Sequence, residues 1–197
     1  MSRYIETIKL KDGEFFRLKY HQQRMNHVFM SFYPDLEVIN LEEYLKTCEF
    51  PMIDVFKCRI VYDSEIREIA FSPYQIRPIQ TLKLINTSIE TTIYKPENRH
   101  AINIAFEQRG ECDDVLFVKH GLITDTSYCN MALYDGQQWI TPRLPLLYGT
   151  QRAYLLEKKR IIEQDIAVEN INKFQKIMLF NAMIEFGELE ISPSFIQ

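Results

Sequence analysis

The sequence predicts an α+β fold in which antiparallel hairpins and amphipathic helices are mixed without regular order. Two β-rich runs, 55–62 and 66–71, are joined by a short turn at 63–65, as in a hairpin. Apolar residues between Leu18 and Phe32 recur every three or four positions, which indicates a helix. Strand and helix signals do not alternate steadily along the chain, so a regular βαβ array is not expected.

We expect residues 1–77 to form a small N-terminal domain. Its expected elements, in chain order, are a strand at 4–10, a short strand at 15–18, a helix from Leu18 to Phe32, a helix at 41–48 and the hairpin of 55–62 and 66–71. Pro34 should stop the long helix, because proline cannot continue one. Pro73 and Pro78 break regular structure, which places the domain boundary near residue 78.

We expect residues 78–197 to form a larger domain. Its expected elements, in chain order, are a strand at 79–85, a helix at 98–109, a strand at 115–119, a hairpin of 131–134 and 138–141, a helix at 150–160 and a strand at 176–180. Asp135-Gly136 would close the hairpin. The stretch from Gly121 to Asn130 is expected to contain a turn that carries Asp125.

The composition argues against several classes of protein. A total of 27 acidic and 23 Lys or Arg residues gives a formal net charge of −4, which disfavours a nucleic-acid partner. The four cysteines form no CxxC pair and the four histidines have no metal-ligand spacing, so we expect reduced thiols and no metal. The N-terminus lacks the apolar region of a signal peptide, and no apolar run is long enough to cross a membrane. We therefore expect a cytoplasmic protein that does not bind membranes.

Two places in the sequence could bind a phosphate. Gly149-Thr150-Gln151-Arg152 opens a helix, and a helix N-terminus offers backbone N–H groups and the positive end of a dipole. Arg24 carries forked donors that suit a phosphate, one helical turn after His21. Each pattern also has a simpler explanation, which is a helix capped by Thr150 in the first case and a solvated helix face in the second.

Lys95 and Asp125 could carry chemistry. A catalytic lysine needs a partly desolvated setting in which its amine can be neutral, although most lysines lie on the surface. A carboxylate can keep a pyridine nitrogen protonated, but an Asp-Thr-Ser sequence can equally satisfy its own backbone in a turn. Cys129 is expected to be a small packed residue and not a nucleophile, because no histidine stands at a recognisable spacing.

Seven short motifs occur in an order that resembles the class IV aminotransferases, the fold-type IV pyridoxal-phosphate enzymes. They are Glu6-Thr7-Ile8, His21-x-x-Arg24, Lys95-x-x-Asn98-Arg99, Gly121-x-Ile123-Thr124-Asp125 with Asn130, Thr141-Pro142, Gly149-Thr150-Gln151-Arg152 and Asn181-Ala182-Met183. This family includes branched-chain and D-amino-acid aminotransferases and aminodeoxychorismate lyase. Each motif is weak alone, and their shared order over most of the chain carries the resemblance.

The resemblance implies a fold like that of D-amino-acid aminotransferase, with a small N-terminal domain, a larger barrel-like β domain with helices, and the cofactor in the cleft between them. It implies that Lys95 holds the aldehyde of pyridoxal 5'-phosphate as a Schiff base. Arg24 and the backbone N–H groups of Thr150 and Gln151 would bind the phosphate, and Asp125 would face the ring nitrogen. A homodimer is also implied.

Three features depart from the family pattern. Asp125 stands where the family usually has a glutamate, and its side chain is one methylene shorter. Five residues precede Glu6, so the resemblance implies a small domain that is shortened at its start. Thr150-Gln151 replaces the usual Ile-Thr, which preserves backbone donors but removes a side-chain hydroxyl at the second position.

The resemblance leaves three activities open. The motifs around Lys95 and Asn181 look most like aminodeoxychorismate lyase, which eliminates pyruvate and leaves 4-aminobenzoate for folate synthesis. The second is an amino-acid aminotransferase of the branched-chain or D-amino-acid type. Either enzyme would act on a small molecule, an amino acid or an aminodeoxychorismate-like compound. The third is a shortened, non-catalytic homologue that acts as a binding protein.

Overall fold

The computed structural model describes residues 2–197, which form two compact units. Unit 1 contains the residues up to Ile76 together with Ile93–Asn98. Unit 2 contains Arg77–Thr92 and Arg99–Gln197. The return of Ile93–Asn98 to unit 1 lies beyond the boundary expected near residue 78, and it brings Lys95 into the same unit as Arg24.

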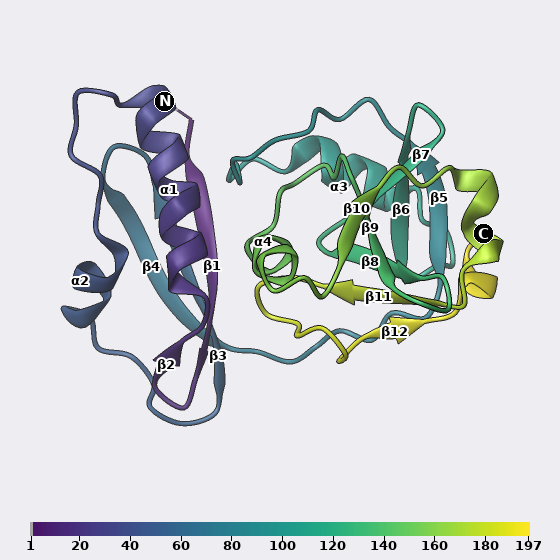
Figure 1. Ribbon diagram of the computed structural model, residues 1–197. Coiled ribbons are helices and arrows are strands. Elements are labelled where there is room, and N and C mark those ends of the chain that lie inside the picture. The colour runs from purple at the N-terminus through teal and green to yellow at the C-terminus, as the bar shows by residue number, and fades with distance from the viewer. Residues whose placement is uncertain (1) are drawn as a thin grey trace. The chain divides into compact units, whose positions relative to one another are not determined.

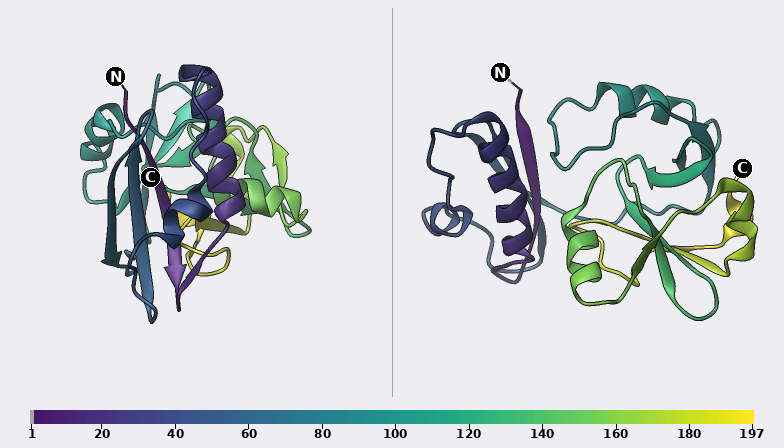
Figure 2. Two further views of the ribbon diagram at one scale, coloured as in Figure 1. Left: turned by 90° about the vertical axis from the view of Figure 1, so that its left-hand side faces the viewer. Right: turned by 45° about the horizontal axis from the view of Figure 1, so that its top comes forward.

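Unit 1 is an antiparallel sheet with two helices on one face (Figures 1 and 2). The strand order is β2-β1-β3-β4. The elements are β1 (Tyr4–Lys11), β2 (Glu14–Phe15), α1 (Leu18–Phe32), α2 (Leu41–Lys46), β3 (Val55–Tyr62) and β4 (Ile66–Pro73). Asp12 and Gly13 both have positive φ, as a tight Asp-Gly hairpin turn between β1 and β2 requires. The long helix ends at Phe32, two residues before Pro34, as the sequence predicts.

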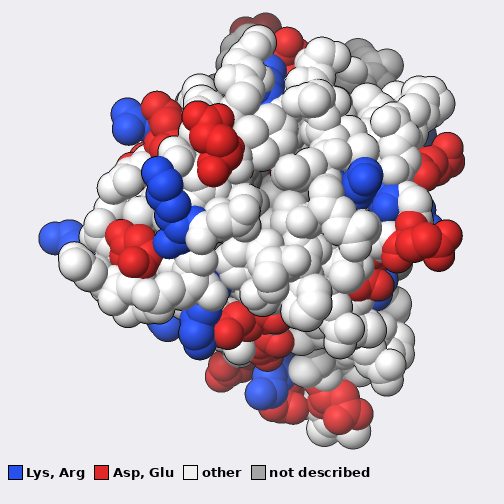
Figure 3. All heavy atoms as spheres, turned by 90° about the vertical axis from the view of Figure 1, so that its right-hand side faces the viewer, with Lys and Arg blue, Asp and Glu red and all other residues white. Residues whose placement is uncertain are grey.

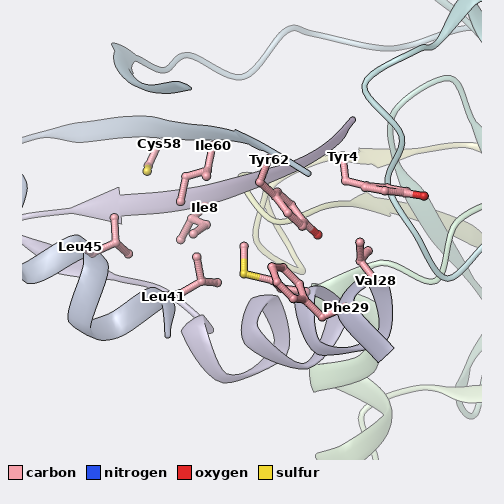
Figure 4. Packing of buried hydrophobic residues seen from close by; sticks show 10 residues of the cluster. Tyr4, Ile8, Val28, Phe29, Leu41, Leu45, Cys58, Ile60 and Tyr62 are labelled. Carbon is pink, nitrogen blue, oxygen red and sulfur yellow. The ribbon is translucent and has the colours of Figure 1, made fainter. Parts of the chain in front are cut away.

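The core of unit 1 lies between the sheet and the two helices (Figure 4). Alternate residues of β1 point to this face, and Ile8 and Leu10 are fully buried there. Val28 and Phe29 of α1 and Leu41 of α2 cover them. This packing fixes α1 against β1, so that side chains from the two elements can meet inside the core.

Unit 2 contains two sheets. The three-stranded sheet has the order β5-β6-β7 and the five-stranded sheet the order β10-β9-β8-β11-β12. Its strands are β5 (Leu82–Asn86), β6 (Asp114–Lys119), β7 (Leu122–Thr126), β8 (Asn130–Tyr134), β9 (Trp139–Pro142), β10 (Ile162–Gln164), β11 (Lys176–Phe180) and β12 (Glu190–Ile191). Its helices are α3 (His100–Glu107), α4 (Thr150–Glu157) and the short 3₁₀ segments η1 (Val168–Lys173) and η2 (Pro193–Phe195). The fold class, α+β, is confirmed, but the described strands form two separate sheets and not one closed barrel.

Several elements differ from the expectation. Asp125 lies in strand β7 and not in a turn, because the β-branched residues around it pair with β6. β5 pairs with β6 in parallel across α3, and β9 pairs with β10 in parallel across α4. These are two single βαβ crossovers that the local sequence signals do not predict. The last helix ends at Glu157, since Lys159 has a positive φ that leaves the helical conformation.

Charged residues are mixed on the face that Figure 3 shows. Lys and Arg side chains are interspersed there with Asp and Glu around a largely uncharged middle. This face therefore offers no continuous basic surface for a phosphate backbone. Within residues 2–197, no helix combines the length and the apolar character that a membrane span requires.

Candidate active site

Lys95 is held against the edge of β1. The backbone N–H of Ile5 donates to the carbonyl of Lys95 at 2.8 Å, and Tyr4 and Pro96 form an antiparallel bridge next to it. The amine Nζ of Lys95 donates to the hydroxyl Oγ1 of Thr7 at 3.0 Å, and the Lys95 side chain is half-buried. Both the backbone and the amine of Lys95 are thus positioned by β1.

Glu6, on the opposite face of β1 from Thr7, lies at the centre of a buried cluster with two residues of α1. Arg24 donates from Nε to Glu6 Oε1 at 2.8 Å and from Nη2 to Oε2 at 2.5 Å. His21 Nδ1 lies 2.5 Å from the same Oε2. Glu6 and His21 are completely inaccessible to solvent, and Arg24 is nearly so.

The charges in this cluster follow from burial and pairing. Burial alone would raise the pKa of Glu6, but the positive charge of Arg24 and the hydrogen bonds from His21 and Arg24 outweigh it and hold that pKa below its usual range. Burial lowers the pKa of His21, and the charges of Arg24 and Lys95 act in the same direction against the attraction of Glu6. The cluster therefore contains an ionised carboxylate, a guanidinium and a neutral imidazole.

Asp125 is buried in unit 2 and bonded through both oxygens. Its Oδ1 accepts from Asn130 Nδ2 at 3.0 Å, and its Oδ2 accepts from the backbone N–H of Leu147 at 2.9 Å. Asn130 Nδ2 also donates to the carbonyl of Leu147 at 2.8 Å. The simpler explanation, in which Asp125 accepts hydrogen bonds from the backbone of its own turn, is not what the structure shows. Asp125 instead accepts a hydrogen bond from Leu147, which lies in a loop 22 residues further along the chain.

The start of α4 lies beside this network. Gly149 is the N-cap residue and Thr150 the first helical residue, so Thr150 is not the cap. A Cβ on Gly149 would come within 2.0 Å of Asn130 Oδ1, so the close approach depends on glycine. Gln151 is buried, and its Oε1 has no hydrogen-bond partner in the described part of the chain. Asp125 and the α4 N-terminus are thus brought together through Asn130 and Leu147.

The turn between β7 and β8 is held by residues from two of the sequence motifs. Arg99 donates from Nη2 to the carbonyl of Ser127 at 2.5 Å. Asn181 donates from Nδ2 to the carbonyl of Tyr128 at 3.2 Å and lies 3.4 Å from Cys129 Sγ. Burial raises the pKa of the Cys129 thiol well above its usual range, which keeps it protonated. Arg99 and Asn181 therefore fix the segment that joins Asp125 to Asn130.

The predicted site residues fall into two groups, one in each unit. Lys95 and Arg24 belong to unit 1, where both lie around β1; Asp125, Thr150 and Gln151 belong to unit 2. Glu6 belongs to the Glu6-Thr7-Ile8 motif, and the sequence alone does not indicate a role for it. The signal that could have revealed a role for Glu6 is its position: a glutamate stands where the alternation of the strand places residues that face the core.

We expect Gly149→Ala to destabilise the protein by about 1–3 kcal/mol, because the added methyl group would displace the Asn130 side chain and with it the bond to Asp125. Urea unfolding measures this loss. Lys158→Ala, at the C-terminal end of the same helix, is the control and should change stability little. An unchanged unfolding midpoint in Gly149→Ala would contradict the close approach.

Burial raises the pKa of Asp125 to about 6, although the bonds from Leu147 and Asn130 and the charge of Arg152 act against it. The folded protein thus holds this proton more tightly than the unfolded chain, so the contribution of Asp125 to stability falls as pH rises from about 4 to about 6. Asp125→Asn removes that dependence. The difference in unfolding free energy between wild type and variant should shift by roughly 3 kcal/mol between pH 4 and pH 8. A constant difference would show that Asp125 titrates normally.

Comparison with known proteins identifies the family. The sequence profile of the family described as amino-transferase class IV matches residues 98–189. A Schizosaccharomyces pombe protein described as a candidate aminodeoxychorismate lyase is 32% identical over 219 residues, which cover 98% of this chain and 91% of that protein. The chain belongs to the class IV aminotransferase family.

Two solved structures are similar to the fold described above. The crystal structure of a candidate 4-amino-4-deoxychorismate lyase from Haemophilus somnus has a TM-score of 0.86 and 32% identity, and the match covers 94% of this chain and 98% of that chain. A hypothetical aminotransferase from Mycobacterium tuberculosis, in its PLP-bound form, has a TM-score of 0.77 and 18% identity, covering 95% and 80%. At that identity the second likeness concerns the fold alone.

Proposed function

We propose that the protein is a pyridoxal-phosphate-dependent lyase of the aminodeoxychorismate type, which releases pyruvate and leaves 4-aminobenzoate. The observation that carries the proposal is the Lys95 amine, half-buried and bonded to the Thr7 hydroxyl at 3.0 Å. A lysine in such a setting can bind a carbonyl group covalently and can move protons. The two relatives that are 32% identical are described as candidate lyases, whereas the aminotransferase from M. tuberculosis is 18% identical.

The residues present fit the cofactor on two grounds. Arg24 has five N–H donors, and two are bonded to Glu6, which leaves donors for a phosphate. The first turn of α4 offers backbone N–H groups and the positive end of the helix dipole, and Gly149 allows the Asn130 side chain to pack against that turn. Arg24 in unit 1, and the backbone of Thr150 and Gln151 in unit 2, are each proposed as a phosphate-binding group.

Asp125 would bind the ring nitrogen of the cofactor. Each of its oxygens accepts one bond from the protein, and a carboxylate oxygen can accept a second. The bonds from Asn130 and Leu147 fix its direction, which compensates for a side chain shorter than the usual glutamate. When bound, the cofactor supplies an electron sink for the charge that develops beside the substrate amine.

Lys95 and Thr7 are the residues that would handle protons. The Lys95 amine can take a proton from the substrate and return it, and the Thr7 hydroxyl lies within hydrogen-bond distance to orient that amine. Conversion of aminodeoxychorismate to 4-aminobenzoate and pyruvate balances without water or a second substrate. Transamination, the alternative, needs a second substrate that accepts the amino group. The two activities can therefore be distinguished by whether a second substrate is required.

The test supplies each substrate separately to protein loaded with pyridoxal phosphate. Aminodeoxychorismate should yield pyruvate and 4-aminobenzoate in equal amounts. Glutamate formation from amino acids and 2-oxoglutarate, without pyruvate release, would favour the aminotransferase instead. Absence of both activities and of any bound cofactor would favour the non-catalytic binding protein.

A further inference from the structure

Glu6 is an ionised carboxylate on the core-facing side of β1. Its neighbours on that face, Tyr4 and Ile8, belong to the apolar core, and Glu6 has no solvent contact. Burying a charge is costly unless it is paired, and a buried ion pair can often be replaced by apolar residues of similar volume without loss of stability. Stability alone therefore does not explain why Glu6 and Arg24 occupy this position.

The geometry of the pair gives a reason. Glu6 takes the Nε–H and one Nη2–H of Arg24 in a two-pronged contact, at 2.8 and 2.5 Å. This contact occupies one edge of the planar guanidinium and fixes its orientation. Three of its five N–H groups remain, on the edges that point away from the carboxylate.

His21 strengthens this arrangement. It is neutral, and its ring nitrogen lies 2.5 Å from the Glu6 oxygen that Arg24 Nη2 also contacts. The imidazole therefore fixes the carboxylate without adding charge. Arg24 is held by Glu6, Glu6 is held by His21, and all three are buried, so the guanidinium has little freedom to turn.

We propose that Glu6 is a positioning residue that orients Arg24 to bind the phosphate of a phosphorylated ligand, an inference that rests on the function proposed above. Glu6 touches neither the ligand nor the reacting atoms and acts through Arg24. If Glu6 and Arg24 form a purely structural ion pair between β1 and α1, loss of Glu6 should weaken the binding of every ligand alike. If Glu6 positions Arg24, its loss should weaken the binding of a phosphorylated ligand and leave the binding of a ligand without a phosphate unchanged.

The experiment compares the affinities of the full-length protein for pyridoxal phosphate and for pyridoxal, measured from the visible absorption of the bound compound. Glu6→Gln keeps the size of the side chain but presents an N–H group to the guanidinium, so the two-pronged contact is lost. We expect it to weaken pyridoxal phosphate binding about 10- to 100-fold, by analogy with residues that orient metal ligands, and to change pyridoxal binding less than about threefold.

Asp63→Asn is the control. It disrupts another Asp–Arg ion pair in unit 1, in which the single Nε–H of Arg67 is shared by the two Asp63 oxygens at 2.8 and 3.0 Å, and it should leave both affinities unchanged. If Glu6→Gln does not fold, Glu6→Asp keeps the buried negative charge but is one methylene shorter, so it cannot hold both Arg24 N–H groups in the same position. That variant should also weaken pyridoxal phosphate binding more than pyridoxal binding.

The outcomes separate this inference from the proposed function. A selective loss of pyridoxal phosphate affinity supports the positioning role. Equal losses for both compounds, or no loss, would overturn it while leaving the proposed cofactor in place. Failure of the wild type to bind either compound would overturn both.

Discussion

Lys95→Ala should lower turnover by roughly 10³- to 10⁴-fold, because the variant lacks the amine that we propose to bind the cofactor and move protons. The structure makes this residue hard to replace. Its backbone is paired with Ile5 and its amine with Thr7, so both its main chain and its amine are held in place by β1. The release of pyruvate measures the loss.

The control for this prediction is Lys11→Ala, which removes an exposed lysine at the end of the same strand. It should retain wild-type activity and stability. Turnover in Lys95→Ala within tenfold of the wild type would show that Lys95 is a structural residue of the β1 edge.

Asp125→Ala should lower turnover by about 10²-fold or more, yet weaken pyridoxal phosphate binding less than tenfold. The reason is that the proposed phosphate contacts, at Arg24 and the start of α4, do not involve the Asp125 side chain. Rate and affinity must therefore be measured on the same preparation. Asp125→Glu retains the carboxylate and should retain more turnover than Asp125→Asn.

A structural role for Asp125 would give a different result. Asp125 also ties β7 to Leu147 through the bond at 2.9 Å, so its loss could loosen the loop before α4. If the Ala variant is unfolded, or loses cofactor affinity as steeply as turnover, the tie to Leu147 is its main contribution. Circular dichroism and urea unfolding distinguish the two cases.

The sequence predicts elements whose signals are local. The helix α1 is recognisable from its apolar spacing and from Pro34, and β1, β3 and β11 from their β-rich composition. Strand β7 was missed because Thr124, Asp125 and Thr126 resemble a turn. Those side chains are buried and polar, which local patterns do not reveal.

The candidate site could be predicted only in part. Family motifs point to Lys95, Arg24 and Asp125, but the contact between Lys95 and Thr7 joins residues 88 positions apart. No periodicity or spacing encodes such a contact, because it depends on how a returning segment pairs with the edge of β1. The role of Glu6 likewise follows only when α1 is packed on the sheet.

We propose that Lys95 binds pyridoxal phosphate covalently. Reduction of the loaded protein with borohydride, followed by peptide mass analysis, tests it most directly. We predict one cofactor per chain, attached to the peptide that contains Lys95, and no attachment in Lys95→Ala. Attachment to a different lysine, or none in the wild type, would contradict the account.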